Sequence, residues 1–147
     1  MSEPVATLVD SNVLLDVMTK DERWFEWSAG ALERAADAGP LVINQIVFAE
    51  VSVRFGRIEE LEAALPAEDF VRTPLPWSAA FLAAKCFVEY RRQVGRRGVR
   101  NSTLPDFFIG AHAAVRRFRL LTRDTTRYRS YFPSVELVAP SASDSGA

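Results

Sequence analysis

The chain has 147 residues, of which 48% are hydrophobic and 25% charged, and its formal net charge is −1. This length and composition predict one ordinary soluble domain with a sizeable core, and the lack of any run of 18 apolar residues excludes a transmembrane helix. A single cysteine, Cys86, excludes an intramolecular disulfide and a zinc–thiolate cluster. The N-terminus lacks the basic start of a secretory signal, so we expect a cytoplasmic protein.

The net charge conceals a polarity along the sequence. Residues 1–70 hold 14 acids and 5 bases, a balance of −9, whereas residues 71–147 hold 5 acids and 13 bases, a balance of +8. Sixteen of the 18 basic residues are arginines, whose planar guanidinium suits phosphate oxygens. The basic half is therefore either a solvated surface that pairs with the acidic half or a face that binds nucleic acid.

Short apolar strands alternate with helical patterns along the chain. In order, we expect a strand at 5–9, a helix starting near Ser11, a helix at 22–39, a strand at 41–44, helices at 45–55, 57–65, 77–94 and 105–118, and strands at 119–122 and 135–139. Apolar strands without polar alternation, separated by helices, are typical of a parallel sheet covered on both faces. The prediction is thus an α/β domain over residues 1–139, followed by a disordered tail at 140–147.

Two of the predicted helices are too apolar to lie on a surface. Helix 22–39 carries one stripe from Phe25 to Ala36 and a second stripe that includes Trp24 and Trp27. Helix 77–94 is apolar almost all round. Either these helices are buried on both sides within the monomer, or they form a dimer or partner surface.

Four acids stand at positions where chemistry is plausible. Asp10 follows the first strand, Asp106 opens a helix three residues after Thr103, and Asp124 follows the strand at 119–122. Each of these three has a structural explanation as a helix or turn cap. Glu50 is harder to explain, because it shares an apolar helix stripe with Ile46, Ala49 and Val53, where an acid must be paired, protonated or bound to a cation.

Parallel α/β geometry brings these acids together. Strand ends and the starts of the following helices share one edge of the sheet, and ligands bind there where the strand order switches. Two carboxylates 4 Å apart repel by about 4 kcal/mol at an effective dielectric of 20. They therefore take up protons or bind a cation, and with oxygen ligands alone the expected ion is Mg²⁺ or Mn²⁺.

The segments "VDSNVLLD", "NQIVFAEV", "LPDFFIGAHA" and "LLTRD" occur in this order. Together they resemble the pattern of PIN-domain ribonucleases, most closely the VapC-type toxins of bacterial toxin–antitoxin pairs, over nearly all of residues 5–139. The resemblance implies a PIN-like three-layer α/β/α fold. It also implies a Mg²⁺- or Mn²⁺-dependent endoribonuclease that forms a homodimer and is inhibited by a cognate VapB-like antitoxin.

The resemblance further assigns roles to particular residues. The four acidic positions of the metal site match Asp10, Glu50, Asp106 and Asp124. The supporting polar positions match Ser11 or Asn12 after the first acid and Thr122 before the last. Arginines beside the acids would hold RNA phosphates, namely Arg96, Arg97, Arg100 and Arg123. Trp24 and Trp27 would suit a groove for the antitoxin. Asp16 either supports the site or, more in keeping with its helical position, faces solvent.

Other interpretations remain open. A phosphatase of the haloacid-dehalogenase type needs a second acid where Asn12 stands, and an EF-hand needs oxygen ligands or glycine where Leu14 and Leu15 stand. The only histidine, His112, is expected to pack or cap within its helix, so a ribonuclease that uses two histidines is excluded. A PIN nuclease of RNA processing and a non-catalytic RNA- or partner-binding module are the remaining alternatives.

Overall fold

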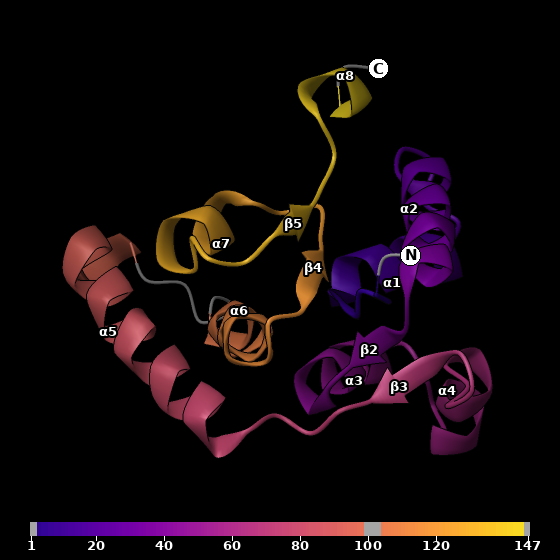
Figure 1. Ribbon diagram of the computed structural model, residues 1–147, viewed down its shortest axis with the longest axis horizontal. Helices are drawn as coiled ribbons and strands as arrows, with labels where there is room; N and C mark the ends of the chain where they lie inside the picture. The colour runs from indigo at the N-terminus through magenta and orange to yellow at the C-terminus, as the bar shows by residue number, and fades with distance from the viewer. Residues whose placement is uncertain (1–2, 99–103, 146–147) are drawn as a thin grey trace.

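The computed structural model describes residues 3–98 and 104–145 and contains a central parallel sheet (Figure 1). Its strands are β1 Thr7–Val9, β2 Leu41–Ile43, β3 Phe70–Arg72, β4 Arg119–Leu121 and β5 Leu137–Val138. They pair in the order β3-β2-β1-β4-β5, and every pair is parallel. The chain therefore builds outward from β1 in one direction and then returns to the other side with β4, so the strand order switches between β1 and β4.

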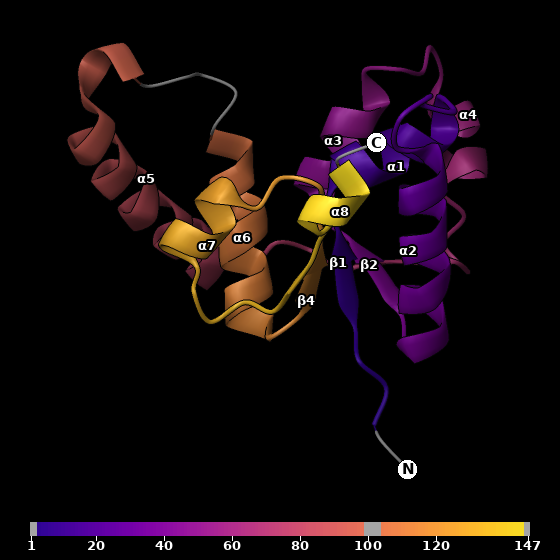
Figure 2. The ribbon, with the colours of Figure 1, turned by 90° about the horizontal axis from the view of Figure 1, so that it is seen from above.

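Helices cover both faces of this sheet, as Figure 2 shows. One face carries α1 Ser11–Met18 and α2 Phe25–Ala38, which pack on each other. The other carries α6 Leu104–Arg116, with α5 Trp77–Gly98 packed on its outer side and α7 Thr126–Tyr131 beside it. Helix α3 Gln45–Ser52 contacts both α1 and α6, and α4 Ile58–Ala64 follows it. The predicted three-layer α/β/α fold is confirmed.

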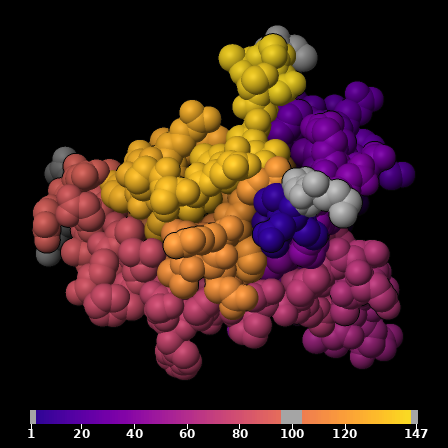
Figure 3. All heavy atoms as spheres, in the orientation of Figure 1, coloured from indigo at the N-terminus to yellow at the C-terminus, as the bar shows by residue number. Residues whose placement is uncertain are grey.

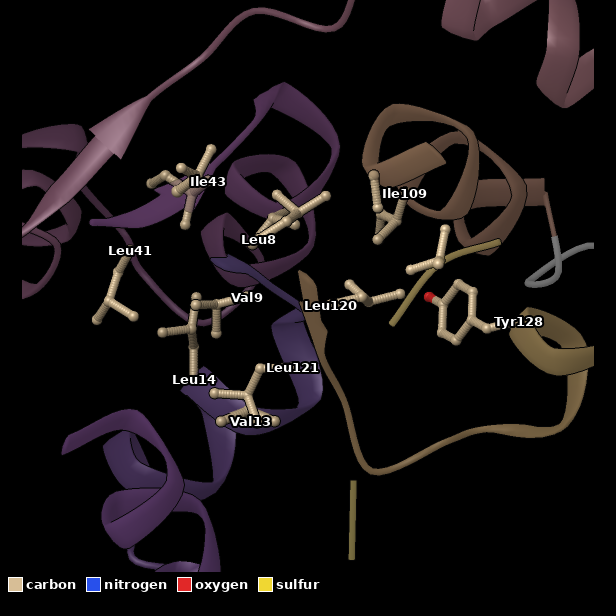
Figure 4. Close-up of a cluster of buried hydrophobic side chains, with 14 of the residues drawn as sticks. Leu8, Val9, Val13, Leu14, Leu41, Ile43, Ile109, Leu120, Leu121 and Tyr128 are labelled. Atoms are coloured by element: carbon tan, nitrogen blue, oxygen red, sulfur yellow. The ribbon is translucent and has the colours of Figure 1, made fainter. Parts of the chain in front are cut away.

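The core lies where the strands meet the helices. The strand residues Leu8, Val9, Leu120 and Leu121 are fully buried, and Figure 4 shows them clustered with side chains from α1, α6 and α7. Short strands with no polar alternation have this environment because both of their faces are covered. None of the described helices is long and apolar enough to cross a membrane.

Three elements were not predicted from the sequence. Strand β3 lies at the edge of the sheet with half-buried and exposed residues, so it lacks the apolar run of the central strands. Helix α7 is short and polar, and α8 Ala142–Ser145 lies inside the tail for which we predict disorder. Figure 3 shows α8 protruding from the body of the molecule, and the disorder of residues 140–147 stays a prediction.

The two apolar helices are buried to different extents. In α2 the stripe that packs on the core is the one containing Trp27, Ala31 and Ala35, so this helix is accommodated within the monomer. Helix α5 is buried on one side only, since it packs on α6 but leaves an outer stripe in solvent. That stripe consists of Trp77, which is 92% exposed, together with Phe81, Ala84 and Val88.

A glycine allows α7 to approach α6 closely. A methyl group at Gly110 of α6 would overlap the ring of Phe132, which directly follows α7. Gly110 lies one turn after Asp106, on the same side of the helix. The contact thus holds the start of α6, which carries Asp106, beside α7.

Candidate active site

The acidic residues gather at the carboxyl edge of the sheet, at the switch point between β1 and β4. Asp10 ends β1, and its backbone N–H donates to the carbonyl of Leu121 in β4 at 2.9 Å. Asp124 follows β4, Glu50 comes from α3, and Asp106 lies in the first turn of α6. The charges of Asp10, Asp124 and Glu50 each raise the pKa of Asp106, so the four acids lie close enough to interact, while their role as a metal site stays a prediction.

Asp10 is buried, with 3% of its surface exposed, and its hydrogen bonds within residues 3–98 and 104–145 come from neutral groups. Its Oδ1 accepts from the backbone N–H of Ser11 at 2.8 Å, which confirms that it caps α1. Its Oδ2 accepts from Thr122 Oγ1 at 2.8 Å and from Tyr128 OH at 3.0 Å. Burial raises the pKa of Asp10 and outweighs these hydrogen bonds, which lower it.

Tyr128 is a functional candidate that the sequence analysis missed. It lies on α7 and is 1% exposed, and Figure 4 shows its hydroxyl directed toward the core cluster near Leu120. The hydroxyl donates to Asp10 Oδ2. Burial and the neighbouring Asp10 raise its pKa well above the usual range, so the hydroxyl keeps its proton and remains a donor. Its position four residues after Asp124 is the one feature of the sequence that would have placed it near the acids. That feature is informative only if the segment is a helix, and α7 is too polar to be predicted as one.

Glu50 is half-buried and accepts a hydrogen bond from Ser11 Oγ at 3.0 Å. Burial raises its pKa, and the charge of Asp10 adds to the effect. The stripe predicted for this helix was wrong, since Val53 is 84% exposed and the buried face consists of Val47 and Val51. Glu50 lies next to that buried face and is only half-buried, and its carboxylate bonds Ser11 beside Asp10. It therefore needs no basic partner within the core.

Asp106 and Asp124 share one cation. Arg127 Nη1 lies 2.8 Å from Asp106 Oδ2 and 3.6 Å from Asp124 Oδ2. The pKa of Asp106 nevertheless rises to about 7, because burial and the three other acids outweigh the arginine. Asp124 also accepts the backbone N–H of Thr126 at 3.2 Å, a local turn cap as expected. Thr103, the proposed cap partner of Asp106, lies outside the described residues.

The polar residues next to the acids join the two strand ends. Thr122 Oγ1 accepts from the backbone N–H of Asp124 at 3.1 Å and contacts Asn12 Nδ2 at 3.4 Å. Asn12 Oδ1 accepts the backbone N–H of Arg123 at 3.2 Å. The residues after β1 and those after β4 are thus tied to each other, which fixes the position of the Asp10 and Asp124 backbones.

Arg123 is paired with an acid inside the protein, and its role as an RNA ligand stays a prediction. Its Nε and Nη2 donate to Asp16 Oδ2 and Oδ1 at 2.5 and 2.9 Å, and its guanidinium lies 5.1 Å from the ring centre of Trp24. The prediction that Asp16 faces solvent is wrong, since Asp16 is 3% exposed and accepts a hydrogen bond from Ser28 Oγ at 2.7 Å. This bidentate pair anchors the loop after β4 to α1 and α2.

The remaining predicted residues differ in how far the structure describes them. Trp24 and Trp27 are half-buried and contact each other edge to face, with ring centres 6.3 Å apart. Arg96 and Arg97 belong to α5, but their side chains fall outside the description, and Arg100 lies outside the described residues. These arginines stay predicted RNA ligands.

His112 packs in the core, as predicted. Its Nδ1 lies 2.9 Å from Asn44 Nδ2, and Asn44 also caps α3 by accepting the backbone N–H of Val47 at 3.0 Å. Burial, with a smaller effect of Arg116, lowers the pKa of His112 to about 4, so the ring is neutral. This contact fixes α3, which carries Glu50, against α6, which carries Asp106.

The donor set fits a hard divalent cation. The acids offer oxygen ligands only, and their mutual repulsion in a partly buried site favours a compensating positive charge. Within the described residues, no three acid, cysteine or histidine side chains are spaced to hold one ion together. An ion at this site would therefore be held by one or two carboxylates at a time. Mg²⁺ binds proteins in this way, because it keeps several of its waters.

Comparison with known proteins agrees with this geometry. The family model of the PIN domain matches residues 7–132, and the chain therefore belongs to the PIN domain family, a family of nucleases. No curated protein matches the sequence closely enough to count as a relative.

Several solved structures share the fold. A chain of VapBC2 from Rickettsia felis, bound to a DNA fragment from its promoter, matches with a TM-score of 0.66 at 16% identity, covering 92% of this chain and 98% of that one. A chain of a toxin–antitoxin complex from Klebsiella pneumoniae matches with a TM-score of 0.62 at 24% identity and the same coverage. A chain of FitAcB from Neisseria gonorrhoeae matches with a TM-score of 0.58 at 19% identity, covering 89% and 95%.

Proposed function

We propose that this protein is the toxin of a toxin–antitoxin pair, a cytoplasmic Mg²⁺- or Mn²⁺-dependent endoribonuclease. The observation that carries the proposal is Asp10, a buried acid at the sheet's switch point that no basic side chain neutralises among the described contacts. The charge of Asp10, together with the charges of Asp124 and Glu50, raises the pKa of the neighbouring Asp106. The toxin assignment is supported by the solved toxin–antitoxin complexes that share the fold.

Different residues of this chain would orient the metal ligands and accept the proton of the attacking water. Thr122, Tyr128 and the Ser11 backbone N–H orient both oxygens of Asp10, which would bind the ion together with Asp106. When bound, the ion would polarise the phosphodiester and lower the pKa of a coordinated water. Ser11 holds one oxygen of Glu50, and its other oxygen can accept a proton from the attacking water. The raised pKa of Glu50 makes it a stronger base than a solvated glutamate.

RNA would approach this edge across the arginine-rich half of the chain. Arg91 and Arg92 are exposed on α5, and Arg96, Arg97 and Arg100 follow them in the sequence. Phosphate binding by these residues would make the affinity fall steeply with salt. Single-stranded or looped RNA suits the site best, because the metal must reach a splayed backbone.

The catalytic proposal is tested with purified protein and a labelled RNA hairpin. Cleavage in Mn²⁺, its loss in EDTA and its loss in Asp10→Asn are expected. Asp37→Asn, which alters an exposed acid of α2, is the matched control and should cleave at the wild-type rate. Wild-type cleavage by Asp10→Asn would refute the assigned site, whereas Mn²⁺-independent RNA binding without cleavage would favour the non-catalytic module.

The partners are an antitoxin and a second copy of this chain. We assign the antitoxin groove to the surface beside Trp24 and Trp27. The half-buried Trp24 ring lies against Arg123, which pairs with Asp16, and Trp27 contacts Trp24 edge to face. In a Trp77→Phe background, fluorescence would report these two tryptophans alone, so an antitoxin peptide encoded by the neighbouring gene should change it. No change at saturation would contradict the groove, and absence of any antitoxin gene would favour an RNA-processing PIN nuclease.

The open stripe on α5 is the candidate surface for the homodimer. Its exposed aromatic side chains, Trp77 and Phe81, would be costly to leave in water. Sedimentation should show a dimer for the wild type and a monomer for Phe81→Glu. A monomeric wild type, or a Phe81→Glu protein that still dimerises, would contradict this assignment.

A further inference from the structure

One arginine already occupies part of the acidic site. The same nitrogen of Arg127, Nη1, lies 2.8 Å from Asp106 Oδ2 and 3.6 Å from Asp124 Oδ2. These carboxylates come from different elements, since Asp106 opens α6 and Asp124 follows β4. The guanidinium therefore bridges two carboxylates of the site, as a bound metal ion would.

Both bridged carboxylates are also proposed ligands of the metal. A carboxylate oxygen that accepts a short hydrogen bond from a guanidinium cannot at the same time coordinate an ion on that lone pair. Arg127 and a divalent cation would also repel each other at this distance. Binding of an ion through these same Oδ2 lone pairs thus requires the guanidinium to leave.

The structure provides space for that movement. Arg127 lines a hollow of about 410 Å³ between α5 and α7, together with Tyr90, Val94, Asp124, Thr126, Ser130 and Tyr131. About a quarter of the Arg127 side chain is exposed already. The backbone of α7 is held by the buried Tyr128, so the side chain can turn into the hollow while the helix stays in place.

We propose that Arg127 is a competing counter-cation that sets the metal affinity of the site. It neutralises Asp106 and Asp124 until a divalent ion displaces it into the hollow between α5 and α7. This inference rests on the proposed metal-dependent function. Arg127 is accordingly a positioning residue, because it acts through the two carboxylates.

The test measures Mn²⁺ binding to the metal-free protein from the electron paramagnetic resonance signal of free Mn²⁺. Arg127→Gln removes the competing charge, and its dissociation constant should be about tenfold lower than that of the wild type. Arg127→Lys keeps the charge and should remain within about threefold of the wild type. Arg129→Gln removes an equal charge from an exposed position on α7 and should leave the affinity unchanged.

The outcomes separate this inference from the proposed function. If neither the wild type nor Arg127→Gln binds Mn²⁺, the metal-dependent function itself fails. If the wild type binds Mn²⁺ and Arg127→Gln binds it equally or more weakly, the competition is refuted while the function stands. An affinity of Arg129→Gln that rises as much as that of Arg127→Gln would show only an effect of net charge and would also refute the inference.

A second measurement covers the case in which Arg127→Gln does not fold. Arginine Nε–Hε resonances of the wild type are followed by NMR during titration with diamagnetic Mg²⁺, and Arg127→Lys identifies the Arg127 signal by its loss. A shift of that signal that follows metal occupancy is expected. A signal that stays fixed at saturating Mg²⁺ would overturn the proposal.

Discussion

Two buried aspartates, six residues apart in the sequence, differ in whether a basic side chain neutralises their charge. Asp10 and Asp16 are both 3% exposed. Asp16 is paired with Nε and Nη2 of Arg123 and with Ser28 Oγ, so its charge is neutralised inside the protein. In the part of the chain that the structure describes, the hydrogen-bond donors to Asp10 are neutral, and burial raises its pKa. A compensated acid anchors the fold, whereas an uncompensated one is available to bind a cation.

The largest effect is expected at the uncompensated acid. Asp10→Asn should reduce RNA cleavage about a thousandfold or more, because a ligand of the proposed ion is lost. Its free energy of unfolding should stay equal or rise at neutral pH, since burial already disfavours the charged form. Single-turnover cleavage and urea denaturation measure both. A large loss of stability would show that Asp10 is structural and would remove the contrast with Asp16.

The compensated acid should respond in the opposite way. Asp16→Asn leaves Arg123 without its partner and should lower the free energy of unfolding by about 3 kcal/mol in urea denaturation. Glu33→Gln on the exposed side of α2 is the control and should stay within about 0.5 kcal/mol of the wild type. An Asp16→Asn protein as stable as this control would mean that the ion pair contributes little.

The tyrosine that orients Asp10 gives an intermediate effect. Tyr128→Phe removes one hydrogen bond to Asp10 Oδ2 and should weaken Mn²⁺ binding about 10- to 100-fold, as loss of a group that orients a metal ligand does. Calorimetric Mn²⁺ titration measures this change. Tyr131→Phe loses a comparable bond, to Gln93 Oε1 at 2.6 Å, outside the acidic site and should bind Mn²⁺ like the wild type. Equal losses in both variants would indicate a general structural effect.

The smallest expected effect is the response to pH. Asp106 has a pKa of about 7, so below that value a proton competes with the ion for its carboxylate. Mn²⁺ affinity should therefore rise by about tenfold per pH unit up to about pH 7 and level off above it. Asp106→Asn should weaken the dependence, and the raised pKa values of Asp10 and Glu50 account for what remains. A wild-type affinity that is flat between about pH 6 and pH 8 would contradict the raised pKa.

The fold was predictable because its central strands are short apolar runs. Strands 5–9, 41–44 and 119–122 were found within one or two residues, since burial on both faces requires such composition. The edge strand β3 and the polar helix α7 were missed, because position at an edge and packing through a single tyrosine leave no such pattern. Resemblance supplied the PIN family, which composition alone would not have named.

The candidate site was only partly predictable. Asp10 and Asp124 were proposed from strand ends, Asp106 from a helix start and Glu50 from an apolar helix stripe, and that stripe was wrong. Ser11 and Thr122 were expected beside the acids, and they bond Glu50 and Asp10. The bond from Tyr128 to Asp10 was not predicted, because it joins residues more than a hundred positions apart. The pairing of Arg123 with Asp16 was not predicted for the same reason, and its role as an RNA ligand stays a prediction.

The sequence by itself determined the alternation of strands and helices, and hence the edge at which the acids meet. Composition and local pattern suffice for this, because burial acts on each segment separately. Only the tertiary structure decided which acid each arginine neutralises, since pairing depends on distances between remote segments. It gave Arg123 to Asp16, placed Arg127 between Asp106 and Asp124, and left Asp10 with neutral donors.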